Sequence, residues 1–77
     1  MELKKGIYKH SKSGKEYELV GTAHHSETLE ELVVYRALYE SSDFGKDAIW
    51  VRPAAMFTEE VLIEGKKVER FQWVREK

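Results

Sequence analysis

The feature that most constrains the fold is the alternation of residue types between Lys15 and His25. Successive side chains of a β-strand point to opposite faces of the sheet, so a period of two predicts a strand that is buried on one face. Gly21 in the middle of this strand indicates a β-bulge or the close approach of another backbone. One face of the predicted strand holds Tyr17, Leu19, Gly21, Ala23 and His25.

Shorter apolar runs on both sides of this segment predict further strands, because each run ends at glycine, proline or small polar residues. Pro53 ends one of them, since proline cannot donate to a sheet ladder. Proline also suits the first position of a helix, so residues 53–57 are predicted to form one helical turn. The other predicted strands cover residues 6–10, 48–52, 61–63 and 68–74, with a turn at 11–14 and a loop at 41–47.

Residues 28–39 have two interpretations. Thr28 and Glu31 form a capping box, which favours a helix over the rest of the segment. Against the helix, four consecutive apolar residues follow Glu31 and would place apolar side chains all around its axis. Such a run is typical of a strand buried on both faces. We therefore predict a turn over 26–31, with at most one helical turn, and then a strand over 32–39.

The C-terminal strands flank a glycine-containing turn, which is a β-hairpin pattern. A turn centred on Gly65–Lys66 places Ile63 opposite Val68. A turn one residue earlier instead places Glu60 opposite Glu69. Opposed like charges are unfavourable across a strand pair, so the first register is predicted.

Five to six short strands with one or two short helical turns define a mainly β fold. We predict a small rolled sheet or an SH3-like barrel. Rolling the sheet hides edge strands that a chain of 77 residues has little else to cover. There are no repeats or linkers, so residues 1–77 are predicted to form a single domain.

Two absences lead us to expect a cytoplasmic protein with no membrane partner. No stretch approaches the roughly 20 apolar residues of a membrane helix, and the N-terminus lacks the apolar core of a signal peptide. The chain also has no cysteine, which excludes disulfides, thiolate zinc sites and a cysteine nucleophile. A small domain without disulfides fits a reducing compartment.

The net charge of −1 hides a segregation along the chain. Residues 1–15 carry a net charge of +4 and residues 65–77 of +3, whereas residues 16–31 carry −5. If the basic ends meet in space, they form a positive surface that would bind nucleic acid with a strong salt dependence. Solvated faces on a small protein are the simpler explanation, so nucleic acid is an alternative partner and not the leading one.

The histidines suggest a second alternative, a small hydrolase or metal-dependent enzyme. Ser26 would be the nucleophile, His10 or His24 the base, and Glu27 the residue that orients the base. His24 and Ser26 are roughly 6.5–7 Å apart along a strand, and no Gly-x-Ser-x-Gly motif surrounds Ser26. His24 and His25 leave a strand on opposite faces, so they cannot share a metal ion without a bulge. We therefore assign no catalytic residue, no metal ligand and no cofactor.

Six short motifs follow one another along most of the chain. They are Gly6-x-Tyr8-x-His10, Gly14-x-x-Tyr17, Ala23-x-His25-Ser26-Glu27-Thr28, Val33-Val34-Tyr35-Arg36-x-Leu38-Tyr39, Trp50-Val51-Arg52-Pro53-x-x-Met56-Phe57 and Gly65-Lys66-x-x-x-Arg70-Phe71. Together they resemble a bacterial family known as domain of unknown function 1653. The resemblance implies a compact small domain and supplies no activity, ligand or catalytic residue, because none is established for the family. It also implies a shorter loop than the one at 41–47.

The leading interpretation is a non-catalytic binding module for a small polar ligand or a protein. Aromatic side chains fill the core of a small β fold, and they also line the shallow grooves that hold peptides or bases. Tyr17, Trp50 and Arg52 have the composition of such a groove. Arg36, Arg52 and Arg70 are expected to pair with glutamates, although a guanidinium also suits carboxylate or phosphate ligands. The predicted binding residues are His10, Tyr17, His25, Glu27, Trp50 and Arg52.

Overall fold

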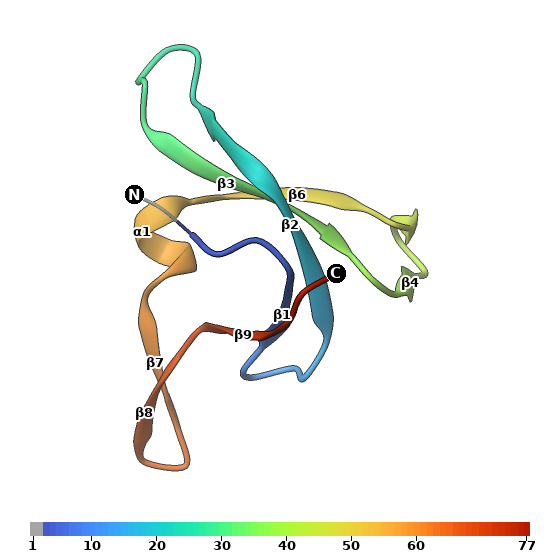
Figure 1. Ribbon diagram of the computed structural model, residues 1–77, viewed down its shortest axis with the longest axis vertical. Coiled ribbons are helices and arrows are strands. Elements are labelled where there is room, and N and C mark those ends of the chain that lie inside the picture. The colour runs from blue at the N-terminus through green and yellow to red at the C-terminus, as the bar shows by residue number, and fades with distance from the viewer. Residues whose placement is uncertain (1–2) are drawn as a thin grey trace.

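The computed structural model describes residues 3–77, and its main element is a five-stranded antiparallel sheet (Figure 1). The strands are β1 (Ile7–His10), β2 (Glu16–His24), β3 (Glu31–Ala37), β6 (Ile49–Pro53) and β9 (Phe71–Arg75). Their order is β6-β3-β2-β1-β9, so β6 and β9 form the edges of the sheet. The mainly β fold predicted from the sequence is therefore confirmed.

Two short ribbons and one helical turn complete the fold. The predicted helical turn is confirmed as α1 (Ala54–Phe57), which directly follows Pro53. No helix among residues 3–77 is long and apolar enough to cross a membrane. The loop predicted at 41–47 takes part in a ribbon. The ribbons pair β4 (Glu40–Ser41) with β5 (Gly45–Lys46) and β7 (Glu60–Ile63) with β8 (Lys66–Glu69).

The prediction of one continuous strand over 68–74 is wrong, because the strand is interrupted at Arg70. There the chain leaves the β7–β8 ribbon and enters the main sheet as β9. The backbone N–H of Arg70 donates to the carbonyl of Glu59, and its carbonyl accepts from the N–H of Ser11, both at 2.8 Å. These bonds attach the β7–β8 ribbon to the corner of the main sheet. In Figure 1 the ribbon extends away from the body of the protein.

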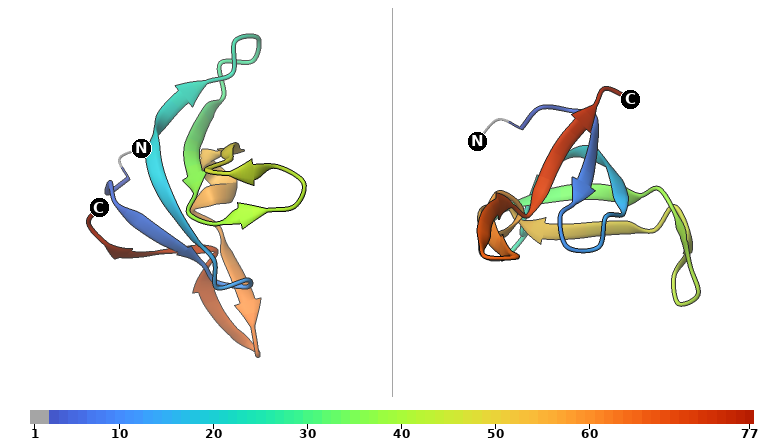
Figure 2. Two further views of the ribbon diagram at one scale, coloured as in Figure 1. Left: turned by 90° about the vertical axis from the view of Figure 1, so that its right-hand side faces the viewer. Right: turned by 90° about the horizontal axis from the view of Figure 1, so that it is seen from below.

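The main sheet is curved, but within residues 3–77 it does not close into a barrel (Figure 2). Of the two predicted forms, the rolled sheet is therefore correct. Pro53 at the end of β6 has no N–H, and the chain turns at once into α1, so β6 offers β9 a poor edge to pair with. Side chains bridge the two edges instead. The ring of Phe57 in α1 stacks on the ring of Phe71 in β9, with centroids 4.3 Å apart.

The curvature gives the sheet an inner face, which holds the core, and an outer face. The core is mainly aromatic, since the ring of Tyr35 lies 5.5 Å from Phe57 and 5.4 Å from Phe71. Rings at these distances and tilted angles interact favourably beyond the area that they bury. The buried residues of this cluster are Tyr8, Leu19, Val33, Tyr35, Ala54, Phe57 and Phe71.

Strand β3 occupies the segment that had two interpretations, so the helical one is wrong. β3 pairs with β2 on one side and β6 on the other, which gives its backbone groups partners along both edges. The turn predicted before it is confirmed, and a histidine caps it. The Nδ1 atom of His25 accepts from the N–H groups of Glu27, at 3.1 Å, and Thr28, at 3.3 Å.

A β-bulge lies in β2 where Gly21 indicated one. Leu19 pairs with Tyr35 and Gly21 pairs with Val34, which leaves Val20 as the extra residue. Directly opposed residues share a face, so the bulge shifts the alternation for the rest of the strand. The single face predicted for the whole of β2 is therefore correct only as far as Leu19.

The β7–β8 hairpin has the register that the sequence analysis rejected. Glu60 lies opposite Glu69, and the turn is centred on Glu64 and Gly65. These two residues have φ values of 52° and 80°, as in the two-residue turns that match the twist of a hairpin. Both opposed glutamates are exposed to water, which screens their repulsion. The predicted register is wrong because turn geometry outweighs that weak repulsion.

Removing the central ring of the core should cost far more stability than removing an exposed ring. Phe57 is 2% exposed, whereas Phe44 is 60% exposed. We expect Phe57→Ala to lower the free energy of unfolding by about 3–5 kcal/mol, through lost burial and the cavity left behind. The matched substitution Phe44→Ala should cost about 1 kcal/mol or less. Urea unfolding followed by tryptophan fluorescence measures both, and similar losses for the two variants would contradict this description of the core.

A second stability prediction concerns Gly6, where β1 and β9 approach closely. A Cβ at this position would lie 2.5 Å from the carbonyl oxygen of Arg75 and 2.7 Å from Nε1 of Trp73, and φ is 138°. We expect Gly6→Ala to lower the free energy of unfolding by about 1–3 kcal/mol. Gly21→Ala is the matched control, because a Cβ at this position would have nothing within 4 Å. Its effect on the free energy of unfolding should therefore stay within about 1 kcal/mol. Thermal unfolding of both variants tests the contrast, which fails if Gly6→Ala is neutral.

Candidate binding surface

Three of the six predicted binding residues lie around the ring of Phe71 on the inner face, and a fourth, Trp50, packs against the same core cluster. The ring of His10 is 4.9 Å from the ring of Phe71, and the ring of Tyr17 is 5.7 Å from it. The guanidinium carbon of Arg52 lies 5.5 Å from the same ring. Trp50 is two residues before Arg52 on β6, so both side chains leave the strand on the same face. The structure thus brings together residues from β1, β2 and β6.

The other two predicted residues, His25 and Glu27, lie elsewhere. They belong to the turn between β2 and β3, at the far end of β2 from His10. In Figure 1 this turn is the tip of the hairpin at the top of the view. Nδ1 of His25 is occupied by the hydrogen bonds that cap the turn, so its role there is structural.

The structure does not bring together His10 and Ser26, two of the residues of the hydrolase alternative. His10 precedes β2 and Ser26 follows it, and a strand of nine residues is roughly 30 Å long. Proton transfer needs contact within about 3 Å, so His10 cannot serve Ser26 as a base. Among residues 3–77, no three His, Asp or Glu side chains gather closely enough to hold a metal ion.

The arginines divide into two kinds. Arg70 pairs with Glu59 at 2.5 Å, Arg75 makes a bidentate pair with Glu16 at 2.9 and 3.1 Å, and Arg36 pairs with Glu18. Pairing with glutamates was predicted for Arg36, Arg52 and Arg70, and it is confirmed for Arg36 and Arg70. For Arg52 the prediction is wrong within residues 3–77, where no carboxylate pairs with it. Its Nε donates to the hydroxyl of Tyr35 at 3.3 Å, and its side chain is partly buried.

The electrostatic surroundings of His10 are positive. Burial is the main cause that lowers the pKa of its imidazole, and the charges of Arg52, Arg70 and Lys12 lower it further. Nδ1 of His10 accepts from the N–H of Ser13 at 3.3 Å, which places the proton of the neutral ring on Nε2. The positive charges of Arg52, Arg70 and Lys12, unlike the burial, also favour an anion beside His10.

A pair of tyrosine hydroxyls adjoins these groups, and only one of them was predicted. The hydroxyls of Tyr17 and Tyr39 are hydrogen-bonded at 2.7 Å. Burial, followed by this hydrogen bond, raises the pKa of Tyr17, so the hydroxyl of Tyr17 stays protonated at neutral pH. Tyr39 was missed because its position depends on the pairing of Tyr17 with Ala37, two residues before it. We call His10, Tyr17, Tyr39, Trp50 and Arg52 together the Arg52 surface.

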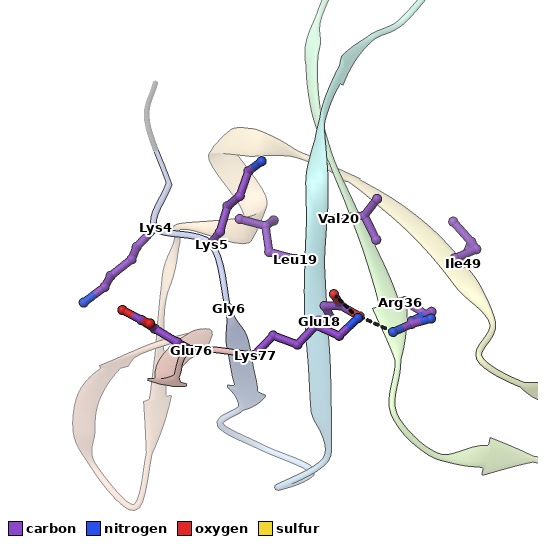
Figure 3. A pocket seen from close by; sticks show the side chains of 10 residues that line it. All are labelled: Lys4, Lys5, Gly6, Glu18, Leu19, Val20, Arg36, Ile49, Glu76 and Lys77. Atoms are coloured by element: carbon purple, nitrogen blue, oxygen red, sulfur yellow. Dashed lines mark hydrogen bonds and ion pairs between the residues drawn. The ribbon is translucent and has the colours of Figure 1, made fainter.

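An open depression of about 740 Å³ lies on the opposite side, over the outer face of the sheet (Figure 3). Glu18 lies within it and pairs with Arg36 and, at 3.0 Å, with Lys77. These contacts, with that of Lys77 first, lower the pKa of the Glu18 carboxyl. No predicted site residue lines this depression, because β2 meets the end of the chain only in the folded protein. We call it the outer depression.

The basic chain ends do meet, since β1 pairs with β9. However, three of the C-terminal cations, Arg70, Arg75 and Lys77, are paired with glutamates from elsewhere in the chain. The positive surface envisaged for nucleic acid is therefore weaker than the sequence charges alone suggest.

Comparison with known proteins identifies the family of the chain. The family model described as "Protein of unknown function (DUF1653)" matches residues 6–73. The chain belongs to the DUF1653 family. It is similar to a crystal structure of a DUF1653 protein from Bordetella bronchiseptica, with 30% identity and a TM-score of 0.85. The match covers 99% of this chain and 92% of the other. No protein of curated function matches the chain significantly.

The position of His10 in this DUF1653 protein leads to a prediction about pH. Folding lowers the pKa of His10 below its unfolded-state value of 6.5, so the folded state favours the neutral imidazole. The contribution of this preference to folding stability is complete above pH 6.5 and is lost as the pH falls from 6.5 toward the folded-state pKa. We expect Arg52→Gln to raise the pKa of His10 partway back, since burial still lowers it. NMR titration of the imidazole measures the shift. Arg75→Gln is the control and should leave the pKa of His10 unchanged; equal effects of the two variants would rule out a local role for Arg52.

Proposed function

We propose that this DUF1653 protein is a non-catalytic binding module, whose Arg52 surface holds a small ligand that carries a carboxylate or phosphate group. The observation that carries the proposal is the state of Arg52. It is the one arginine of the sequence without a glutamate or aspartate partner within residues 3–77, and it lies beside a histidine in positive surroundings.

The guanidinium of Arg52 is already oriented for a ligand. Its Nε is bonded to the hydroxyl of Tyr35, and its plane lies near the ring of Phe71. The two terminal nitrogens have no carboxylate within residues 3–77, and an anion with two oxygens matches their spacing. Because Tyr35 is buried and fixed by the core, little conformational freedom is lost when a ligand binds.

The neighbouring groups favour a ligand with a flat or apolar part next to its anionic group. Trp50 is about 6.5–7 Å from Arg52 along β6. The ring of Phe44, which is exposed, lies 4.9 Å from the ring of Trp50 and extends the aromatic area. The hydroxyl pair of Tyr17 and Tyr39 adds polar contacts on the other side. Such a mixture of aromatic area and a few placed polar groups is typical of small-molecule sites.

Binding rather than catalysis is supported by the lack of an activated nucleophile at this surface. The groups that could attack or transfer protons, His10 and Ser26, lie at opposite ends of β2. A cytoplasmic location is part of the proposal, since a chain without cysteine suits a reducing compartment.

The test is a titration of the labelled protein with phosphate, succinate and adenosine monophosphate, followed by NMR. We expect shifts at the Nε–H of Arg52 and at the rings of His10 and Trp50. Arg52→Gln should weaken binding about 10- to 100-fold, because a hydrogen bond to a charged group contributes about 1.5–3 kcal/mol. Arg75→Gln, the matched control, should bind like the wild type.

Three results would count against the proposal. The first is an absence of binding to every anion tested, and the second is an equal loss of affinity in both arginine variants. The third is binding of a single-stranded oligonucleotide that shifts the lysines of residues 4–15 and leaves Arg52 unchanged. That last result, with a steep salt dependence, would favour the nucleic-acid alternative.

A further inference from the structure

The outer face of β2, β3 and β6 is apolar over most of its area, and nothing within residues 3–77 covers it. On β6, Ile49 and Val51 point away from the core and are 59% and 58% exposed. Val20, at the bulge of β2, is 50% exposed. The central strand adds Val34, which lies directly between Val51 and Gly21 in the pairing of the three strands. A continuous apolar patch of this kind is typical of an interaction surface.

The sequence of β3 points to the same conclusion. Four consecutive apolar residues, Leu32 to Tyr35, are typical of a strand that is buried on both faces. The structure buries only the inner two, Val33 at 0% and Tyr35 at 5% exposure, while Leu32 and Val34 remain partly accessible. Another molecule packed against the sheet would bury the outer half of this pattern.

One end of this face is basic. The outer depression is lined by Lys4, Lys5, Arg36 and Lys77 against two carboxylates, with Val20 and Ile49 beside them (Figure 3). Of the carboxylates, Glu18 is already paired twice. The depression therefore offers an apolar floor with an excess of positive charge around it.

The other end is acidic. The turn between β2 and β3 carries Glu27 and Glu30 on either side of Leu29, and we call these three residues the acidic tip. Leu29 is 70% exposed and has a φ of 63°, a conformation that side chains other than glycine adopt at a cost. Two backbone hydrogen bonds fix it: Leu29 N–H donates to the carbonyl of His25, and His25 N–H donates to the carbonyl of Glu30. The turn thus presents an apolar side chain between two negative charges.

We propose that the outer face is the interface of a two-fold symmetric dimer. A two-fold axis through the apolar centre of the face exchanges its ends, so the acidic tip of each copy lies at the outer depression of the other. The apolar residues of the two sheets then pack face to face. A single surface with a basic end, an apolar centre and an acidic end is complementary to itself when two copies meet about a two-fold axis.

Sedimentation equilibrium over a range of concentrations tests the dimer, and the wild type should approach twice the 9.0 kDa of the chain. Val51→Lys places a charge in the centre of the interface and should weaken the dimer more than tenfold. Its side chain is exposed in the monomer, so the fold should persist, and circular dichroism checks this. Leu62→Lys is the matched control, because Leu62 is 64% exposed on the β7–β8 ribbon and lies outside the proposed interface.

A charge exchange tests the orientation of the two copies. Glu30→Lys and Lys5→Glu should each weaken the homodimer, since the first cancels the net charge of the acidic tip and the second that of the outer depression, at both contacts. A mixture of the two variants should favour the heterodimer, in which one contact keeps the wild-type charges and the other brings together the two introduced charges, which are of opposite sign. Native mass spectrometry of the mixture, with one variant isotope-labelled, measures that preference.

A protein that stays monomeric at millimolar concentration would overturn the proposal. So would a dimer that Val51→Lys leaves intact, or one in which the charge-exchanged mixture shows no preference for the heterodimer. The experiment is independent of the Arg52 surface, because Val51→Lys lies on the opposite face of β6 and should leave anion binding unchanged.

Discussion

The stack of Phe57 on Phe71 is the interaction on which the rest of the structure depends. It joins α1, which continues from edge strand β6, to the other edge strand β9. Strand pairing between these edges is absent from the described chain, so side-chain packing holds them together, helped by the backbone hydrogen bond from Arg70 to Glu59. Tyr8 and Tyr35 pack their rings against Phe57 and fill the space that the curvature encloses. A sheet of five short strands thereby obtains a core without closing into a barrel.

Using the inner face as a core limits where a ligand can bind. Phe71 and Tyr35 are buried, so only the groups around their margin, above all Arg52 and His10, remain accessible to a ligand. The same buried rings position those groups, since Arg52 contacts both Tyr35 and Phe71 and His10 contacts Phe71. The buried rings therefore make the Arg52 surface small, because they leave few accessible groups, and rigid, because they hold those groups in place.

Local patterns in the sequence predicted the parts of the fold that depend on neighbouring residues. The alternation of β2, the apolar run of β3 and the helical turn after Pro53 all correspond to observed elements. Pairings between distant segments were not predictable in this way. His10 lies opposite Phe71 only because β1 pairs with β9, and no residue near His10 encodes that partner. The predicted binding residues divided into two groups: strand periodicity placed Trp50 beside Arg52, whereas the predicted strand over 15–25 already separated His10 from His25, and grouping them in one site disregarded its length.

Ion pairs determine how the charge that is segregated along the sequence is distributed in the fold. Glutamates from the acidic part of the sequence pair with cations near the C-terminus, as Glu16 does with Arg75 and Glu18 with Lys77. These long-range pairs neutralise charge along the junction of β2 with the two chain ends. Arg52 lies on the inner face, among aromatic rings that offer no carboxylate. A chain that is nearly neutral as a whole thus retains a local positive charge at the one place where aromatic side chains and a histidine surround it. Burial in the core and pairing of the glutamates elsewhere act together to produce that charge, and neither is visible in the composition.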